Sequence, residues 1–183
     1  MVPPPSSSSE VLKHVHMFGL KGSVRSNVHF LEEGTVLYPA GNTIAVYHTD
    51  TREQELIPGT LPSNGFAPEG ITALSVSPNR RVVAVAERTD SHAIVQLYDS
   101  STLRRRKVLS YPDVGSKEYV HVSFSNDSKS CLTLGGAPDY TLVLWTVDKS
   151  VKVLASVKLS APNAAAVEEE AEADKSAVVN IMF

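Results

Sequence analysis

The segment 71–111 places the strongest constraint on the fold, because it contains four short runs rich in β-branched and aromatic residues. Apolar residues recur in these runs at every second position or in short blocks, the pattern of strands that bury one or both faces. The runs are 71–77, 82–87, 93–98 and 107–111, and polar turn sequences separate them. They predict one antiparallel four-stranded sheet. A single sheet of ~40 residues cannot bury both of its faces, so it requires similar sheets stacked beside it.

Two further segments, 27–58 and 118–159, repeat this pattern. Their expected strands are 27–31, 35–39, 43–49 and 54–58 in the first copy, and 118–124, 130–134, 141–147 and 151–159 in the third. Ser77 and Ser125 hold the same place in consecutive copies, 48 positions apart. An aromatic residue closes the third strand of every copy, namely Tyr47, Tyr98 and Trp145. This period is typical of propeller blades. The sequence therefore predicts an all-β fold, a WD40-like β-propeller.

The remaining segments predict that this propeller is incomplete. Residues 1–10 are rich in Pro and Ser and are expected to be a disordered tail, whereas 11–20 alternate like a strand and are expected to close the last blade. Residues 161–175 form an acidic insertion between blades, and 176–183 match the first strand of a fourth blade. Propellers close with about 4–8 blades. We therefore expect a fragment of a larger protein, prone to aggregation through its uncovered apolar faces.

The overall composition narrows the classes of partner. The 183 residues carry a formal net charge of −3, which predicts neither nucleic acid nor an acidic membrane surface as partner. There is no apolar run of about 18 residues, so no membrane-spanning helix is expected. The lone cysteine, Cys131, cannot form an intramolecular disulfide, which favours a reducing compartment.

Few residues of the sequence have the spacing of a chemical site. The six histidines follow no known metal-binding spacing, and Cys131 lies in a strand without an identifiable base. Ser75, Ser77, Ser123 and Ser125 hold matching positions and are interpreted as strand hydroxyls with satisfied hydrogen bonds. Gly135 and Gly136 belong to a turn, since a phosphate loop lies between a strand and a helix. No catalytic residue, cofactor or metal site is predicted, and the chain is not expected to be an enzyme.

One cluster is a candidate contact for a partner. The densest group of basic residues can be joined by two arginines of the turn between the runs 71–77 and 82–87. The set comprises Arg104, Arg105, Arg106, Lys107, Arg80 and Arg81. One interpretation is an electrostatic contact, for example with the acidic surface of tubulin. The alternative is a solvated edge strand whose charges prevent pairing with another chain.

Several short motifs suggest a family. They are FGL at 18–20, LYPAGN at 37–42, IPG at 57–59, SVSPNRR at 75–81 and RKVL at 106–109. The segment that contains them, about 18–133, resembles the N-terminus of the cilia- and flagella-associated WD-repeat proteins. The chain departs from the common WD pattern, because no Gly-His pair opens a blade and no Trp-Asp pair closes one. Tyr98-Asp99 comes nearest.

The resemblance implies a protein of the ciliary or flagellar axoneme, part of the cytoskeleton, in which N-terminal propellers precede a coiled coil. It implies a scaffold that places or regulates inner dynein arms, with axonemal proteins such as inner-arm components as partners; tubulin is the further candidate that the basic cluster suggests. Two alternatives remain: a WD-repeat interaction platform outside cilia, and a propeller enzyme whose site lies in the missing blades. An enzyme of this fold would carry convergent polar residues after its first strands, where this chain has Leu31, Pro78 and Asn126.

Overall fold

The computed structural model describes residues 16–60 and 70–159, which fold into β-strands joined by turns. The first sheet contains β1 (His29–Glu32), β2 (Thr35–Ala40), β3 (Thr43–His48) and β4 (Glu53–Pro58). The second contains β5 (Ile71–Val76), β6 (Val82–Glu87), β7 (Ile94–Asp99) and β8 (Arg105–Ser110). The third contains β9 (Tyr119–Phe124), β10 (Ser130–Gly135), β11 (Thr141–Thr146) and β12 (Lys152–Lys158). The predicted all-β fold is confirmed.

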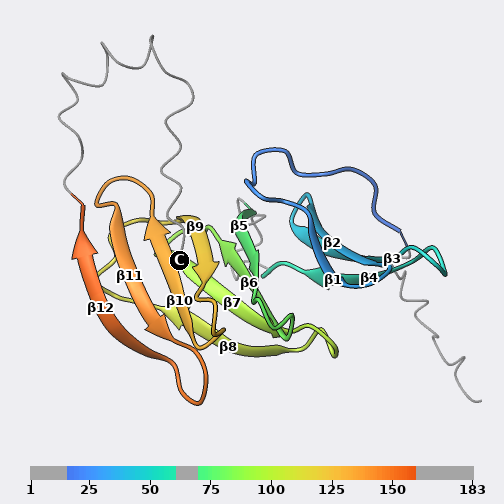
Figure 1. Ribbon diagram of the computed structural model, residues 1–183. Coiled ribbons are helices and arrows are strands. Elements are labelled where there is room, and N and C mark those ends of the chain that lie inside the picture. The colour runs from blue at the N-terminus through green and yellow to red at the C-terminus, as the bar shows by residue number, and fades with distance from the viewer. Residues whose placement is uncertain (1–15, 61–69, 160–183) are drawn as a thin grey trace, which may run out of the picture.

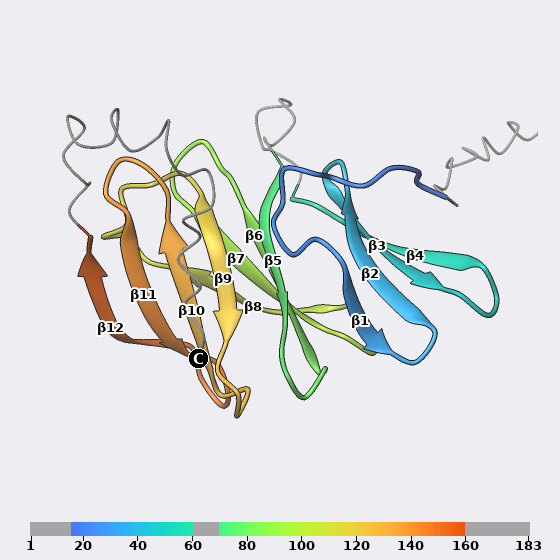
Figure 2. The same cartoon turned by 45° about the horizontal axis from the view of Figure 1, so that its top comes forward.

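Each sheet is an antiparallel meander in which the strands pair in chain order. The first strands of the sheets are neighbours, and the Thr72 hydroxyl of β5 donates a hydrogen bond of 2.7 Å to the Tyr119 carbonyl of β9. Figures 1 and 2 show β9, β5 and β1 in the middle of the molecule, with β12 at one end and β4 at the other. This is the arrangement of consecutive blades in an incomplete WD40-like propeller, and the described sheets do not close into a ring.

The second sheet is buried on both faces because it lies between the other two. In β6, Val83 and Val85 pack into a core with the first sheet, whereas Ala84 and Ala86 pack into a core with the third. Successive side chains of a strand point to opposite faces, so this strand must be apolar throughout. That requirement explains the unbroken apolar run Val-Val-Ala-Val-Ala in its sequence.

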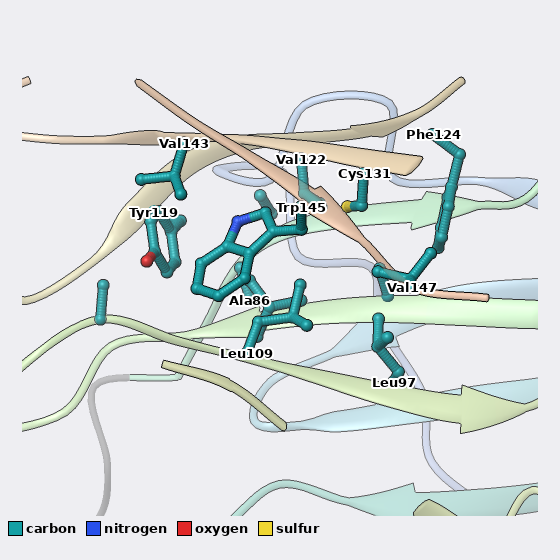
Figure 3. Packing of buried hydrophobic residues seen from close by; sticks show 14 of the residues in the cluster. Ala86, Leu97, Leu109, Tyr119, Val122, Phe124, Cys131, Val143, Trp145 and Val147 are labelled. Carbon is teal, nitrogen blue, oxygen red and sulfur yellow. The ribbon is translucent and has the colours of Figure 1, made fainter. Parts of the chain in front are cut away.

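The core between the second and third sheets is built around Trp145, whose side chain is 2% exposed. Its ring lies among Ala86, Leu109 and Tyr119 (Figure 3). The indole N–H donates a hydrogen bond of 2.9 Å to the Thr133 hydroxyl of β10. Thus the third sheet joins its second and third strands through a Trp-Thr hydrogen bond although the chain has no Trp-Asp pair. A buried indole N–H requires such a partner.

The strand bounds agree with the sequence predictions to within two residues. The shift that matters for function is in β8, which begins at Arg105 and not at Lys107. The register slips by one residue between Leu97 and Tyr98, so that Arg106 forms a bulge on β8. The third sheet repeats this slip, with Leu154 as the bulged residue of β12. Arg105 and Arg106 therefore belong to a strand and not to the preceding turn.

The segments outside the three sheets are only partly described. Residues 16–20 are irregular and form no strand; the Met17 N–H donates to the Gln54 side chain of β4 at 2.8 Å. The Gln54 side chain thus provides the hydrogen-bond partner for the backbone N–H of this segment. Residues 11–15, and with them the predicted closing role of 11–20, lie outside the described residues, as do the expected tail 1–10, the insertion 161–175 and the fourth-blade strand 176–183. Among the described residues no helix has the length and apolarity needed to cross a membrane.

Candidate interaction surface

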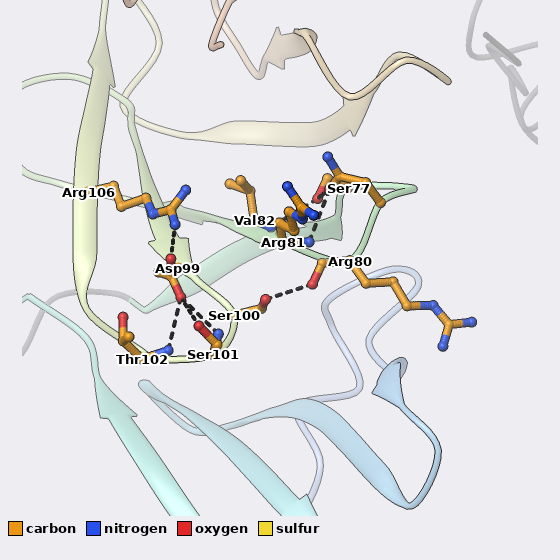
Figure 4. Close-up of polar contacts among 10 residues, drawn as sticks. Ser77, Arg80, Arg81, Val82, Asp99, Ser100, Ser101, Thr102 and Arg106 are labelled. Carbon is orange, nitrogen blue, oxygen red and sulfur yellow. Dashed lines mark hydrogen bonds and ion pairs between the residues drawn. The ribbon is translucent and has the colours of Figure 1, made fainter. Parts of the chain in front are cut away.

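Two turns of the second sheet lie side by side and bring the predicted basic residues to one rim. They are the turn between β5 and β6 and the turn between β7 and β8 (Figure 4). The Ser100 hydroxyl donates to the Arg80 carbonyl at 2.6 Å, and the Ser100 N–H donates to the Arg81 carbonyl at 3.1 Å. These bonds fix the backbone of each turn against the other. The arginines on them are consequently held on a preorganised frame.

The β5–β6 turn is shaped by its own side chains. The Ser77 hydroxyl donates to the Asn79 side-chain oxygen at 2.8 Å and accepts from the Val82 N–H at 2.9 Å. The same Asn79 oxygen accepts from the Arg81 N–H at 3.0 Å. Arg80 takes a left-handed φ of 57°, which a tight turn of this kind requires. Ser77 is therefore a turn residue and not the strand hydroxyl that its position predicted.

The β7–β8 turn is organised by Asp99, which is 8% exposed. Its carboxylate accepts hydrogen bonds from the Ser101 N–H at 2.9 Å, the Ser101 hydroxyl at 2.6 Å and the Thr102 N–H at 2.9 Å. The Arg106 guanidinium forms an ion pair with the other carboxylate oxygen (Figure 4). An Asp that accepts from the next backbone N–H groups is a common way to close a turn. Asp99 and Arg106 together hold the start of β8.

The structure divides the six predicted contact residues into two groups. In the first group each side chain is used by the fold. The Arg105 guanidinium donates to the Gln96 side chain at 3.2 Å, Arg106 pairs with Asp99, and the Lys107 ammonium donates to the carbonyls of Val147 and Asp148 at 2.9 and 2.8 Å. Lys107 thus ties β8 to the third sheet.

The second group consists of Arg80, Arg81 and Arg104, all of them exposed. None of their guanidinium groups has a bonding partner within residues 16–60 and 70–159. We call these three residues the free arginines. They lie on the two turns that Ser100 joins, and their charge is available to an approaching partner. The predicted contact is thereby narrowed from six residues to three.

A buried polar network lies between the first and second sheets. Glu87 and Gln96 are each 2% exposed. The Glu87 carboxylate accepts from the Thr60 N–H at 3.3 Å and from the Gln96 amide at 2.8 Å. The Tyr98 hydroxyl donates to the Gln96 oxygen at 3.0 Å, and burial, followed by the charge of Glu87, raises the pKa of Tyr98 to about 12. The network borders a cleft of about 530 Å³.

This network was not predicted, although the sequence contains a signal for it. Glu87 and Gln96 are polar residues inside runs that are otherwise apolar. A buried polar group needs a hydrogen-bond partner, so two such residues on neighbouring strands of one predicted sheet indicate that they bond to each other. In the register of β6 and β7, Glu87 lies opposite Ile94 and Gln96 lies opposite Val85. The two polar residues are therefore diagonal neighbours, close enough to form a hydrogen bond.

The other residues considered for chemistry have structural surroundings. Cys131 is fully buried, and burial raises the pKa of its thiol to about 12, so it packs as a protonated apolar side chain. Ser125 shapes the β9–β10 turn, donating to Asp127 at 2.6 Å. In the described part of the chain no three His, Cys, Asp or Glu side chains gather as metal ligands.

The fold defines the class: three blades of a WD40-like β-propeller. No known protein-family profile matches the chain. It is 36% identical to mouse cilia- and flagella-associated protein 57 over 85% of its length, and 31% identical to mouse cilia- and flagella-associated protein 44 over 71%. It is 26% identical to cilia- and flagella-associated protein 57 C of Tetrahymena thermophila over 81%. The chain is thus a homologue of the cilia- and flagella-associated proteins, as its motifs predicted. It spans 12%, 7% and 12% of these relatives.

Proposed function

We propose that this chain is a non-catalytic interaction module of the ciliary axoneme, which helps to place or regulate inner dynein arms on doublet microtubules. The observation that carries the proposal is the set of three free arginines on one rim of a fold whose relatives are cilia- and flagella-associated proteins. Such a module requires a rigid shape and a charged surface. The partner contacted by the rim is an acidic protein surface, on an inner-arm component or on tubulin.

The geometry of the rim suits this role. Turns fixed by side-chain hydrogen bonds lose little conformational freedom when a partner binds. Exposed guanidinium groups attract carboxylates over distances of about 8–10 Å at physiological salt, which speeds association and selects acidic partners. Binding through the free arginines is accordingly expected to weaken as the salt concentration rises.

The test reverses the three charges in the full-length protein that contains this chain. The variant Arg80→Glu, Arg81→Glu, Arg104→Glu should be lost from detergent-extracted axonemes, while the unmodified protein is retained. The matched control reverses three lysines of the third sheet, Lys117→Glu, Lys129→Glu, Lys149→Glu. Lys129 holds the place of Arg81 in the next repeat, 48 positions later, and all three lysines are exposed. The net charge changes equally in both variants.

Each outcome of this experiment supports a different conclusion. Loss of the arginine variant with retention of the lysine variant supports a contact made by the rim. Equal retention of both variants would reject it, and equal loss of both would show that overall charge decides retention. Circular dichroism of each protein confirms the fold, which should persist because the free arginines stabilise no contact within the described residues.

A further inference from the structure

The outermost strands of the three sheets, β4, β8 and β12, differ in how they are protected from other chains. An outer strand has N–H and C=O groups that point away from its sheet and that another extended chain can bond. Proteins block this pairing with charged residues, proline, bulges or covering segments. The three strands hold equivalent places, so the protection of each can be compared directly.

The first two outer strands carry such protection. β4 has Glu53 and Glu55 and ends at Pro58, and the Gln54 side chain bonds both the N–H and the carbonyl of Met17, at 2.8 and 3.2 Å. β8 begins with Arg105, Arg106 and Lys107. Charge, proline and a covering segment therefore oppose the addition of another strand at β4, and charge opposes it at β8.

Within the described residues β12 has no proline, no central charge and no covering segment, and it shares with β8 only a one-residue bulge, at Leu154. It has seven residues, and only its ends, Lys152 and Lys158, are charged. The five residues between them are Val-Leu-Ala-Ser-Val. Leu154 is 57% exposed and Val157 is 52% exposed, high values for aliphatic side chains in a strand. An exposed, uncharged outer strand of this length is suited to pair with another chain.

The backbone of β12 is oriented to accept a partner strand. The Leu159 N–H donates to the Tyr140 carbonyl at 3.4 Å, toward the sheet, and Val143 lies opposite Ser156. In an antiparallel pair, alternate residues direct their N–H and C=O groups to opposite sides. Ser156 and Lys158 therefore direct theirs away from β11, into solvent. These groups are free to bond an added strand without loss of any bond within the sheet.

We propose that β12 is a docking edge, which binds an extended segment of a partner protein as a fifth strand of the third sheet. The charges around it specify the chemistry of that segment. Lys152 and Lys158 flank an apolar centre, so the segment that fits has β-branched residues in its centre and acidic residues at both ends. The Lys158 ammonium lies 4.0 Å from Asp139 but is 65% exposed, which leaves it available.

The same charges disfavour a second copy of this chain as the occupant. Two β12 strands that pair in antiparallel orientation place Lys152 of each opposite Lys158 of the other. Parallel pairing places identical lysines beside one another. Like charges directly across a strand pair destabilise it. The docking edge is separate from the free arginines, which belong to the second sheet, and the proposal stands independently of the proposed contact on the rim.

The test uses a fluorescent heptapeptide, Glu-Thr-Val-Thr-Val-Thr-Asp with blocked ends, and the full chain. We expect saturable binding by fluorescence anisotropy. Leu154→Lys, which adds the kind of charge that β8 carries, and Ser156→Pro, which removes an outward N–H, should each weaken binding at least tenfold. Ser156→Thr is the matched control, because it keeps the N–H and the hydroxyl, and it should bind like the unmodified chain. Circular dichroism verifies that each variant is folded.

Three results would overturn the proposal. In the first, Leu154→Lys and Ser156→Pro bind the peptide as well as the unmodified chain does. In the second, a peptide with lysines at both ends binds equally well, so that charge complementarity plays no part. In the third, sedimentation shows that the chain self-associates and that both variants abolish this, which would make a second copy the occupant. Leu154→Lys changes an exposed side chain, so its result can be interpreted even if Ser156→Pro impairs folding.

Discussion

A basic side chain is most available to a partner where its own fold leaves it unpaired or largely exposed. Arg104 and Arg106 are two positions apart, yet Arg106 pairs with Asp99 and Arg104 is free. The sequence shows the cluster but not this division, because the division depends on the bulge that turns Arg106 toward Asp99. Lys107 likewise reaches carbonyls 40 and 41 positions away. Such long-range partners follow from the stacking of sheets and have no local signal.

Histidine burial predicts a loss of stability in mild acid. Burial lowers the pKa of His29 below its ordinary 6.5, against smaller opposing contributions from the backbone at Ser26 and Leu74. Burial, and then the charge of Arg25, lowers the pKa of His121 in the same direction. As the pH falls below about 6.5, the unfolded chain takes up protons that the folded chain resists. The free energy of unfolding should therefore fall as the pH decreases through this window.

Urea denaturation at pH values about one unit above and one unit below the ordinary histidine pKa measures this effect. The double variant His29→Gln, His121→Gln removes both groups and should reduce the difference in unfolding free energy between the two conditions. An undiminished difference in the double variant would assign the acid sensitivity to other groups.

At the level of elements, the turn between the first two strands repeats from the second sheet to the third as closely as the strands do. In the β9–β10 turn, the Ser125 hydroxyl donates to Asp127 and accepts from the Ser130 N–H at 3.0 Å, as Ser77 does with Asn79 and Val82. The two turns also touch, since the Asn79 N–H donates to the Ser128 hydroxyl at 3.1 Å. The 48-residue spacing of the serines predicted the repeat, but their role in the turn appeared only in the structure.

Because Ser77 and Ser125 have the same role in their turns, their substitution should have similar effects on stability. Ser77→Ala and Ser125→Ala each remove one acceptor for a backbone N–H, and each should lower the free energy of unfolding by about 1 kcal/mol. Ser77→Ala should have the larger effect, because Ser77 is 1% exposed and Ser125 is half-buried. Urea denaturation gives both values, with Ser101→Ala on the exposed β7–β8 turn for comparison. Equal stability of Ser77→Ala and the unmodified chain would contradict the role given to this hydroxyl.

At the level of the whole molecule, the sequence predicted the three sheets because each must bury its faces against a neighbour. The continuous apolar run in β6 already indicates a strand covered on both sides. The interactions that hold neighbouring sheets together differ from one pair of sheets to the next, however. The core between the second and third sheets centres on Trp145, whereas the contact between the first and second also contains the buried pair Glu87 and Gln96, which bonds the Thr60 backbone. A repeated sequence pattern predicts the same kind of contact between every pair of neighbouring sheets. The sequence therefore could not show that these two contacts differ.

The polar network predicts that the first sheet can be loosened selectively. Glu87→Leu removes the acceptor of the Thr60 N–H and of the Gln96 amide, and the Gln96 amide lies in the buried core. We expect a loss of about 1–3 kcal/mol in the free energy of unfolding. In hydrogen exchange, amides of β2–β4 should lose more protection than those of β10 and β11, because Thr60 lies two residues after the end of β4. Glu87→Gln keeps an acceptor oxygen and should lose less. Uniform loss of protection over all three sheets would instead show that they unfold as one cooperative unit, in which the network has no local effect.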